Sequence, residues 1–301
     1  MTFAGLENVW GAPILGILRH RLHGVLLDQA DKAGVEVRAG AAVTGYREAV
    51  GAITVVMADT STVDGDLLIG ADGLRSAVRA QMLDDGEPVY RGFSAVRSVG
   101  QAPPAHPHGF LAYGRGLILF TAAIGDGNVY WVASITAPQN AWPSKDGATA
   151  HRDLLHLMKG WDPSLTRVVA EADPQTLVLT DIYDRDPVTT WHRGRAVLLG
   201  DAAHPMVYTM GQGANVTLED GTCLVHHLAR GTAVNEALSA YTAERAPRTA
   251  KITKQSRMMG SIGQTTNPAA AWFRNRMMTL MTPGNPNKQN ADVFGWQPPG
   301  P

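Results

Sequence analysis

The stretch AVLLGDAAHPMVYTMGQGAN, residues 196–215, joins a short apolar run to an acidic turn and a Gly-x-Gly sequence. The apolar run predicts a buried strand, and Asp201 follows it directly, at the strand end where open α/β sheets bind their ligands. Gly211 and Gly213 let a ligand approach the backbone closely, and the helix expected next offers N–H groups and a positive end to an anion. The stretch therefore predicts one part of a site for a phosphorylated or polyhydroxylated cofactor.

The Gly-x-Gly sequence is not specific by itself. Val216 stands where a third glycine would complete the dinucleotide-binding fingerprint G-x-G-x-x-G, so a flexible loop explains the two glycines equally well. None of the 301 residues begins a complete G-x-G-x-x-G sequence. Other parts of the chain are needed to identify the cofactor.

A second acidic turn follows another predicted strand. In LLIGADGLRSAVR, residues 67–79, Asp72 lies in the turn, and Arg75 and Arg79 are four residues apart in the segment expected to be helical. A helix cap worth about 1 kcal/mol is the simpler explanation of Asp72 alone. Because Asp201 stands in the same position after its own strand, we expect carboxylate and cations to converge here and Asp201 to accept hydrogen bonds from sugar or ribityl hydroxyls.

Composition places the chain among globular proteins. It has 301 residues, 45% of them hydrophobic and 18% charged, enough for one large domain or two ordinary ones. A net charge of -1 gives no electrostatic reason to expect nucleic acid or a membrane surface as a partner. Cys223 is the only cysteine, which excludes an internal disulfide and is typical of a reducing compartment. Because neither a basic leader nor a membrane-spanning apolar stretch is evident, we expect a cytoplasmic protein.

Hydrophobic spacing predicts an α/β architecture. Strands and helices are expected to alternate at the front of the chain, with a helix over residues 19–33 capped by Gly34. The strands expected there are residues 35–38, 52–57 and 66–70. A β-rich region with one helix near Leu154 is expected to follow, with strands at 116–125 and 128–135. Helices are expected over 214–229 and from Glu236 onward, the second one kinked at Pro247.

Taken in order, these motifs resemble those of the flavin-dependent aromatic monooxygenases with the para-hydroxybenzoate hydroxylase fold, in their salicylate-hydroxylase-like branch. The matching stretches are an arginine helix from Arg19, GADGLRSAVR at 70–79, DRDPVTTWHRGRAVLLGDAAHPM at 184–206, GQGANVTLEDG at 211–221 and AYTAERAPRT at 240–249. They are specific in combination and extend over nearly the whole chain. Gly221 departs from the pattern, because the family usually has alanine there.

The resemblance implies roles for individual residues. Arg19 would contact the phosphate or ribityl region of FAD, Asp201 would hold the ribityl chain, and the turn from Gly211 to Asn215 would face the flavin ring. Asp72 and Arg75 would support the pyrophosphate end and the access of the nicotinamide cofactor. The implied cofactor-binding set is Arg19, Asp72, Arg75, Gly200, Asp201, Pro205, Gly211, Gly213, Ala214 and Asn215, and the implied catalytic set is Tyr208, Gly211 and Gln212. Arg97 and Tyr113 fall in the β-rich region that would roof an aromatic substrate.

The implied activity is an oxidoreductase reaction in which FAD, reduced by NADH or NADPH, uses O2 to hydroxylate an aromatic or similar small molecule. The implied fold is α/β, an incomplete Rossmann-like FAD-binding domain with an inserted β-rich substrate domain and C-terminal helices. The expected boundaries are 1–87 and 186–234 for the FAD-binding domain, 88–185 for the β-rich domain, 235–282 for the C-terminal helices and 283–301 for an irregular tail.

Relatives begin with a strand-helix-strand unit that carries G-x-G-x-x-G and holds the ADP half of FAD, and this sequence does not contain that unit. We therefore expect weak or absent FAD in this chain alone, and strands at 66–69 and 196–199 that lose their pairing partners. A truncated enzyme, a homo-oligomer, a split flavoprotein completed by an N-terminal chain, and a flavin-free small-molecule-binding remnant remain as alternatives. We expect no metal site, because the histidine pairs have no third ligand.

Tyr208 departs from the family inside the expected site. Relatives usually carry a proline shortly before the Gly-x-Gly turn, beside the flavin edge that reacts with oxygen. Proline fixes φ at about -65° and has no N–H, whereas tyrosine adds an N–H, a phenol and a ring. Either oxygen use is poorly coupled to hydroxylation, or the ring points away and the turn tolerates it.

Overall fold

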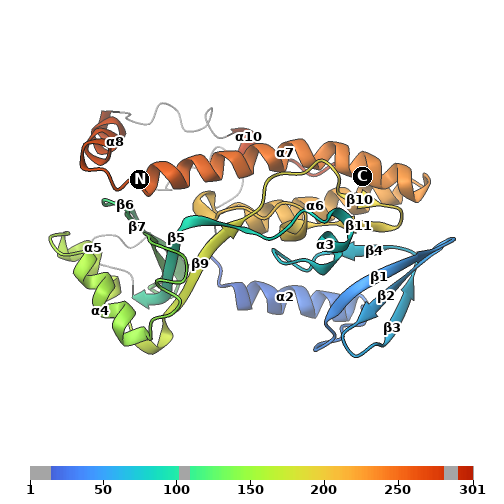
Figure 1. Cartoon of the computed structure of the whole chain (residues 1–301), viewed down its shortest axis with the longest axis horizontal. Helices are drawn as coiled ribbons and strands as arrows, with labels where there is room; N and C mark the ends of the chain where they lie inside the picture. The colour runs from blue at the N-terminus through green and yellow to red at the C-terminus, as the bar shows by residue number, and fades with distance from the viewer. Residues whose placement is uncertain (1–14, 102–108, 281–290, 301) are drawn as a thin grey trace. The chain divides into compact units, whose positions relative to one another are not determined.

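The computed structural model describes residues 15–101, 109–280 and 291–300 (Figure 1). Contacts divide the chain into two units, and each is described by itself. Unit 1 comprises the described residues of 1–37, 90–182 and 261–295, and unit 2 those of 38–89, 183–260 and 296–301. The domain boundaries expected from the sequence stay a prediction.

A five-stranded sheet forms the centre of unit 1, in the order β6-β7-β8-β5-β9. Its strands are β5 (Val89–Gln101), β6 (Leu111–Tyr113), β7 (Leu117–Gly125), β8 (Asn128–Thr136) and β9 (Val178–Asp184). β7 pairs antiparallel with β6 and with β8, and β8 pairs antiparallel with β5. The two long apolar runs predicted as strands are thus central strands of one sheet.

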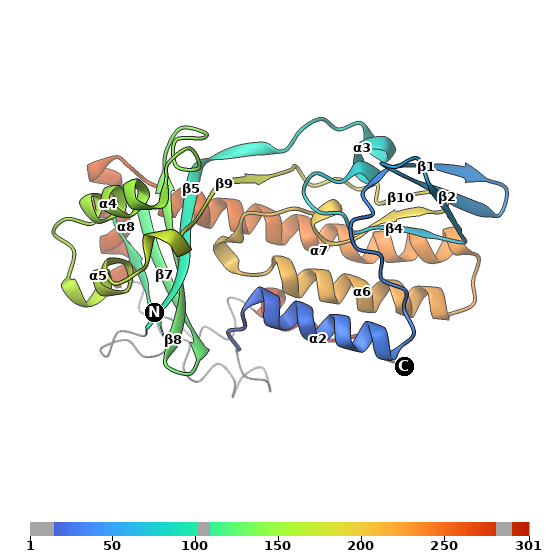
Figure 2. The ribbon, with the colours of Figure 1, turned by 90° about the horizontal axis from the view of Figure 1, so that it is seen from below.

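Two helices cover one face of this sheet, as Figure 2 shows. They are α4 (Gly147–Leu157) and α5 (Pro163–Ala170), and Asp146 and Asp162 cap them by accepting backbone N–H groups. Side chains alternate between the two faces of a strand, so one set from β7 and β8 packs under the helices. That set includes the buried residues Leu117, Leu119, Trp131 and Ala133.

The remaining elements of unit 1 include α2 (Arg19–Lys32), the 3-10 helix η1 (Pro174–Thr176), α8 (Pro268–Leu280) and α10 (Ala291–Phe294). The helix predicted over 19–33 is confirmed, and Gly34 has the left-handed φ of 74° expected of its cap. The strand predicted at 35–38 is wrong: these residues form no strand, because the described part of the chain gives them no pairing partner. The helix α10 lies in the segment predicted to be irregular, of which residues 283–290 lie outside the described residues.

Unit 2 contains two three-stranded sheets. One is the antiparallel sheet β1 (Val43–Ala49), β2 (Ala52–Met57) and β3 (Thr62–Gly65). The other has the order β10-β11-β4, with β4 (Leu68–Gly70), β10 (His192–Arg193) and β11 (Ala196–Leu198). β11 and β4 run parallel, with Ala196 opposite Leu68. The expectation that these strands lose their partners is wrong for β11, which pairs with β10 on one side and β4 on the other. Among the described residues β4 pairs with β11 alone and lies at the edge of the sheet.

Helices pack on this sheet and on each other. They are α3 (Ala77–Leu83), α6 (Gly213–Ala229) and α7 (Val234–Gly263), with the 3-10 turns η2 (Gly200–Ala202) and η3 (Tyr208–Met210) between β11 and α6. The helices α6 and α7 lie side by side in both ribbon views (Figures 1 and 2). α7 continues through Pro247. Buried side chains from β11, α3, α6 and α7, including Leu198, Val78, Leu224 and Tyr241, form one core.

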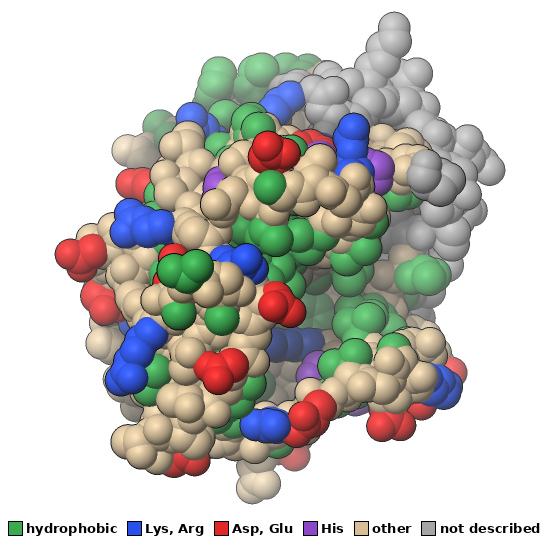
Figure 3. All heavy atoms as spheres, turned by 90° about the vertical axis from the view of Figure 1, so that its right-hand side faces the viewer, with side chains coloured by type: hydrophobic (Ala, Val, Ile, Leu, Met, Phe, Trp, Pro, Cys, Tyr) green, Lys and Arg blue, Asp and Glu red, His purple; other side chains and the backbone are tan. Residues whose placement is uncertain are grey.

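Within the described ranges, no helix is long and apolar enough to cross a membrane. In the same part of the chain, no group of three His, Cys, Asp or Glu side chains could hold a metal ion. Basic and acidic side chains are interspersed on the face that Figure 3 displays.

Candidate functional site

The turn after β11 exposes one carboxylate and buries its neighbours. Gly200 starts the turn with φ 61°, a left-handed conformation that favours glycine. A Cβ at Gly200 would also come within 2.9 Å of the Thr217 side chain. Asp201 is exposed, whereas the other residues of the turn, Gly200, Ala202, Ala203, His204 and Pro205, are buried. The backbone therefore presents Asp201 outward from an otherwise buried turn.

Two buried side chains hold this turn in place. The carboxylate of Asp220, on α6, accepts the N–H of Gly200 at 3.2 Å and a hydrogen bond from Nε2 of His204. The Arg79 guanidinium, on α3, donates to the carbonyl oxygens of Ala202 at 3.0 Å and Ala203 at 2.8 Å. Both ends and the middle of the turn are thus fixed by groups that are fully buried.

At the end of β4, Asp72 supports the start of α3, whose N-cap is Ser76. Its carboxylate accepts the backbone N–H of Ala77 at 2.7 Å and the hydroxyl of Ser76 at 2.5 Å, which organises the start of α3. The simpler explanation of Asp72 as the cap is therefore right about a structural role but wrong about the position, because Ser76 accepts the N–H of Arg79 at 2.8 Å and is the cap. The role of Asp72 toward a cofactor pyrophosphate stays a prediction.

The expected convergence of Asp72, Arg75 and Arg79 is wrong. Arg75 is exposed, pairs with Glu87 at 3.1 Å, and lies 5.6 Å from the centroid of the Tyr183 ring. Arg79 is buried and turns toward the Asp201 turn. The four-residue spacing of Arg75 and Arg79 does not place them on one helix face, because α3 begins only at Ala77 and Arg75 precedes the helix. Two residues share a helix face at this spacing only when both are helical.

Asp85 balances the buried charge of Arg79. It accepts a hydrogen bond from Arg79 Nε at 2.9 Å and lies 3.3 Å from Nη1 of Arg185. Burial opposes ionisation of this carboxyl group, but the hydrogen bond and charge of Arg79 and the charge of Arg185 outweigh it and lower the pKa of Asp85. The guanidinium that holds the turn is therefore paired.

The start of α6 lies beside Asp201. A Cβ placed on Gly213 would be 4.0 Å from Asp201 Oδ1. The side chain of Gln212, the residue before α6, makes no capping hydrogen bond to the first N–H groups of the helix. A Cβ placed on Gly211, which has φ 65°, would meet no atom of the described residues within 4 Å. Carboxylate, helix N-terminus and open backbone thus meet at one place.

Tyr208 and Gln212 flank this backbone. Tyr208 is the first residue of η3, after Val207 in an extended conformation with ψ 143°. Its side chain is half-buried. Gln212 is buried, and its amide donates to the carbonyl of Met210 at 3.2 Å. The Gln212 side chain therefore braces the turn that precedes α6.

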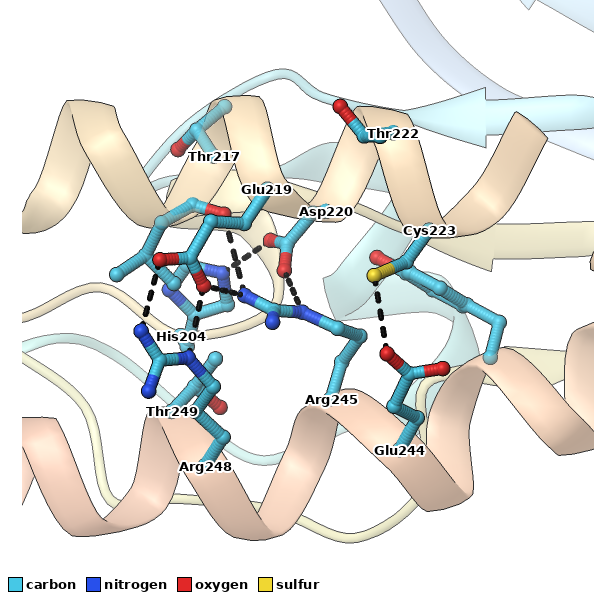
Figure 4. Close-up of polar contacts among 12 residues, drawn as sticks. His204, Thr217, Glu219, Asp220, Thr222, Cys223, Glu244, Arg245, Arg248 and Thr249 are labelled. Carbon is cyan, nitrogen blue, oxygen red and sulfur yellow. Dashed lines mark hydrogen bonds and ion pairs between the residues drawn. The ribbon is translucent and has the colours of Figure 1, made fainter. Parts of the chain in front are cut away.

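A buried ionic network joins α6 to α7 (Figure 4). Arg245 donates to Asp220 Oδ1 at 2.8 Å and to Glu219 at 2.7 Å, and Arg248 also binds Glu219 at 2.8 Å. Burial disfavours the Arg245 cation, but the charges of and hydrogen bonds to Asp220 and Glu219 outweigh it and raise the pKa of Arg245. The network anchors Asp220 from the side opposite His204.

The second face of the unit 1 sheet carries a different set of residues. Cross-strand partners share a face, and Arg97 is opposite Val132, which is opposite Phe120. None of the three belongs to the core under α4 and α5. Arg97 hydrogen-bonds Thr180 and Tyr130, and its Nε is buried with no partner among the described residues. Arg97 therefore retains one buried donor for a further acceptor.

Two tyrosines accompany Arg97 in this sheet. Burial raises the pKa of Tyr130, partly offset by the charge of Arg97, and burial also raises the pKa of Tyr113. Tyr113 is opposite Ile118 on the neighbouring strand, and the Arg274 guanidinium lies 5.2 Å from the centroid of its ring. Both phenols therefore stay protonated at neutral pH and can donate hydrogen bonds.

The predicted cofactor residues divide between the two units. Arg19 is the first residue of α2 in unit 1 and is exposed. The others belong to unit 2 and are Asp72, Arg75, Gly200, Asp201, Pro205, Tyr208 and the turn from Gly211 to Asn215. Asp201 and the start of α6 are brought together, whereas Arg75 turns to Glu87.

A family model described as FAD binding domain matches residues 4–256. The chain belongs to this family. The resemblance read from the motifs is thereby confirmed, as is the mixed α/β fold, and the chain is a member of the FAD-dependent monooxygenases.

Named relatives of this FAD-binding family match most of the chain. Aurachin C monooxygenase/isomerase of Stigmatella aurantiaca is 37% identical over 274 residues, which cover 90% of this chain and 70% of that protein. 3-Hydroxybenzoate 6-hydroxylase 1 of Aquipseudomonas alcaligenes is 32% identical over 297 residues, 96% of this chain and 73% of that one. The crystal structure of Klebsiella pneumoniae HpxO with FAD and uric acid has a TM-score of 0.89 and 26% identity, and covers 97% of this chain and 75% of that chain.

The sequence did not identify the buried residues that fix the turn carrying Asp201. Asp220 and Arg245 lie within stretches that the motifs identified, but nothing in their spacing showed that they meet. Arg79 was expected beside Asp72 and instead binds the Asp201 turn. Asp220 and Arg245 could have been found as charged residues at buried helix positions, because a charge buried in a core needs a partner.

Proposed function

We propose that this chain binds FAD at residues 200–215 and uses it with NADH or NADPH and O2 to hydroxylate a small aromatic molecule. The observation that carries the proposal is the exposed Asp201 carboxylate on a buried turn, next to a helix N-terminus that the side chain of its N-cap residue, Gln212, leaves uncapped. When bound, FAD supplies the redox chemistry, and the protein supplies binding, orientation and electrostatics.

The residues present fit a flavin in three respects. The carboxylate of Asp201 is an acceptor for ribityl hydroxyls. The N–H groups at the start of α6, together with the helix dipole, favour negative charge on a reduced ring. The open space above Gly211 lets a flat ring approach the backbone. Each of these features belongs to unit 2.

The substrate side of the proposal rests on unit 1. Arg97 carries a buried Nε donor with no partner among the described residues, in a row with Val132 and Phe120. A guanidinium beside apolar side chains suits an aromatic ring that bears a carboxylate or another acidic oxygen. The names of relatives support this class, since one hydroxylates 3-hydroxybenzoate and another was crystallised with uric acid.

Replacing Asp201 with alanine is expected to weaken FAD binding by about 1.5–3 kcal/mol, the scale of hydrogen bonds to a charged group. Flavin fluorescence titration of the two proteins measures the difference. Asp66→Ala is the matched control, because it removes another exposed carboxylate from unit 2, before β4, and should leave the affinity unchanged. Equal affinity of the Asp201→Ala protein with an intact circular dichroism spectrum would contradict the proposed site.

Tyr208→Pro is expected to raise the share of NAD(P)H consumption that ends in hydroxylated product. The first position of η3 accepts proline, and the extended Val207 before it has the conformation that precedes proline most readily. Proline removes the Tyr208 ring and N–H and stiffens the backbone before Gly211. The measurement is the yield of hydrogen peroxide per NAD(P)H consumed by the two proteins, in the presence of FAD and a substrate that stimulates reduction. A lower yield in Tyr208→Pro is the expected result. Tight coupling in the unaltered protein would show that Tyr208 does not impair it.

The reaction itself is tested by following NADH and NADPH oxidation with excess FAD and a panel of ring acids, among them 3-hydroxybenzoate, salicylate and urate. The proposal requires that at least one aromatic compound stimulates oxidation and yields a product heavier by one oxygen atom. Arg97→Gln should raise the KM of an acidic substrate and leave FAD affinity unchanged. Stimulation by non-acidic compounds alone would contradict the role given to Arg97.

A further inference from the structure

A single buried carboxylate contacts both ends of the turn that carries Asp201. Asp220 Oδ2 accepts the N–H of Gly200, the residue before Asp201, and a hydrogen bond from His204, three residues after it. Figure 4 shows His204 and Arg245 reaching Asp220 together. Asp220 and His204 are both nearly inaccessible to solvent.

We infer that Asp220 and His204 are positioning residues for the proposed FAD site, and that they act by fixing the turn from Gly200 to His204 and so the place of the Asp201 carboxylate. The part that concerns FAD rests on the proposed function. The part that concerns the turn stands on these contacts alone.

The His204 side chain has a single polar anchor among the described residues. An ionised carboxylate only accepts, so Nε2 of His204 carries the proton of this bond. The other ring nitrogen, Nδ1, is buried and has no partner in the described part of the chain. Trp191 lies against the imidazole, with 5.3 Å between ring centroids. Asp220 therefore sets the orientation of the His204 ring.

Asp220 can act as a fixed point because it is held from the other side. Arg245 Nε binds its second oxygen at 2.8 Å, and Glu219, bound in turn by Arg248, holds the same guanidinium. The turn is consequently tied through α6 to α7, and no group that contacts a ligand is needed to keep Asp201 in place. Preorganisation of this kind reduces the ordering that ligand binding requires.

Two substitutions at His204 separate the hydrogen bond from the ring. His204→Phe keeps an aromatic ring against Trp191 and removes the donor. His204→Gln keeps a donor that can reach the position of Nε2 and removes the ring. The matched control is His227→Phe, which removes a similar bond, from His227 Nε2 to Glu244 at 2.8 Å, elsewhere on α6.

Hydrogen exchange of the Gly200 amide, measured without flavin relative to the Leu198 amide of β11, tests the turn. We expect His204→Phe to speed Gly200 exchange about tenfold relative to Leu198. His204→Gln should restore most of the protection, and His227→Phe should leave the ratio unchanged even if it lowers the melting temperature. An unchanged ratio in His204→Phe would overturn the inference, as would an equal change in His227→Phe.

Titration with FAD tests the consequence for the cofactor. His204→Phe should weaken binding about tenfold, and His204→Gln and His227→Phe by much less. If the unaltered chain binds no FAD, the proposed function fails while the exchange experiment still decides the positioning role. If Gly200 exchange responds and FAD affinity does not, the turn is fixed as inferred but does not set the cofactor affinity, and that half of the inference is wrong.

Discussion

Replacing Arg245 with methionine is expected to lower the free energy of unfolding by about 3–5 kcal/mol, the typical effect of removing one partner from a buried ion pair. Arg245 is fully buried and binds the carboxylates of Asp220 and Glu219. Methionine fills much of the same space but removes the guanidinium that pairs with Asp220, whereas Glu219 keeps its pair with Arg248. Urea unfolding followed by circular dichroism measures the change.

The matched control for this substitution is Arg167→Met. Arg167 pairs with Glu171 on the surface of α5, at 2.7 Å, with both side chains more than half exposed. Exposed pairs of this kind contribute about 0.5 kcal/mol or less. A loss below about 1 kcal/mol in Arg245→Met would mean that the network in Figure 4 contributes little to stability.

The purified chain is expected to carry much less than one FAD per molecule. Its 301 residues contain no G-x-G-x-x-G sequence, which in dinucleotide-binding folds cradles the pyrophosphate. Each loss of about 1.4 kcal/mol weakens binding tenfold, and a pyrophosphate cradle supplies several such steps. Visible absorbance of the protein, and of the flavin released on denaturation, measures the occupancy.

Riboflavin provides the control for this expectation. It has the ring and ribityl chain but lacks the pyrophosphate and adenosine, so it should bind this chain within about tenfold of FAD if Asp201 and the start of α6 supply most of the contacts. Asp201→Ala should weaken both ligands by the same factor. A yellow preparation with one FAD per chain, or FAD binding about a thousandfold tighter than riboflavin, would show that other residues hold the ADP half.

Much of the secondary structure could be predicted because it depends on local pattern. The helical spacing of α2 and α6 specifies helices, whose backbone hydrogen bonds lie within one segment. The apolar runs that became β7 and β8 specify strands through their residue types. The strand expected at 35–38 failed for a related reason. Valines at alternate positions favour a strand, but a strand also needs a partner, and the described residues provide none.

The sequence by itself determined the family, the α/β class and the position of Asp201 after a buried strand, because these depend on residue types at fixed spacings along the chain. Only the tertiary structure decided which charged groups meet. Arg79 reaches the carbonyls of residues 202 and 203, and Asp220 binds Gly200, His204 and Arg245. These contacts join segments far apart in the chain. A buried charge specifies that a partner must exist, but it does not specify which one, since that depends on how the helices pack.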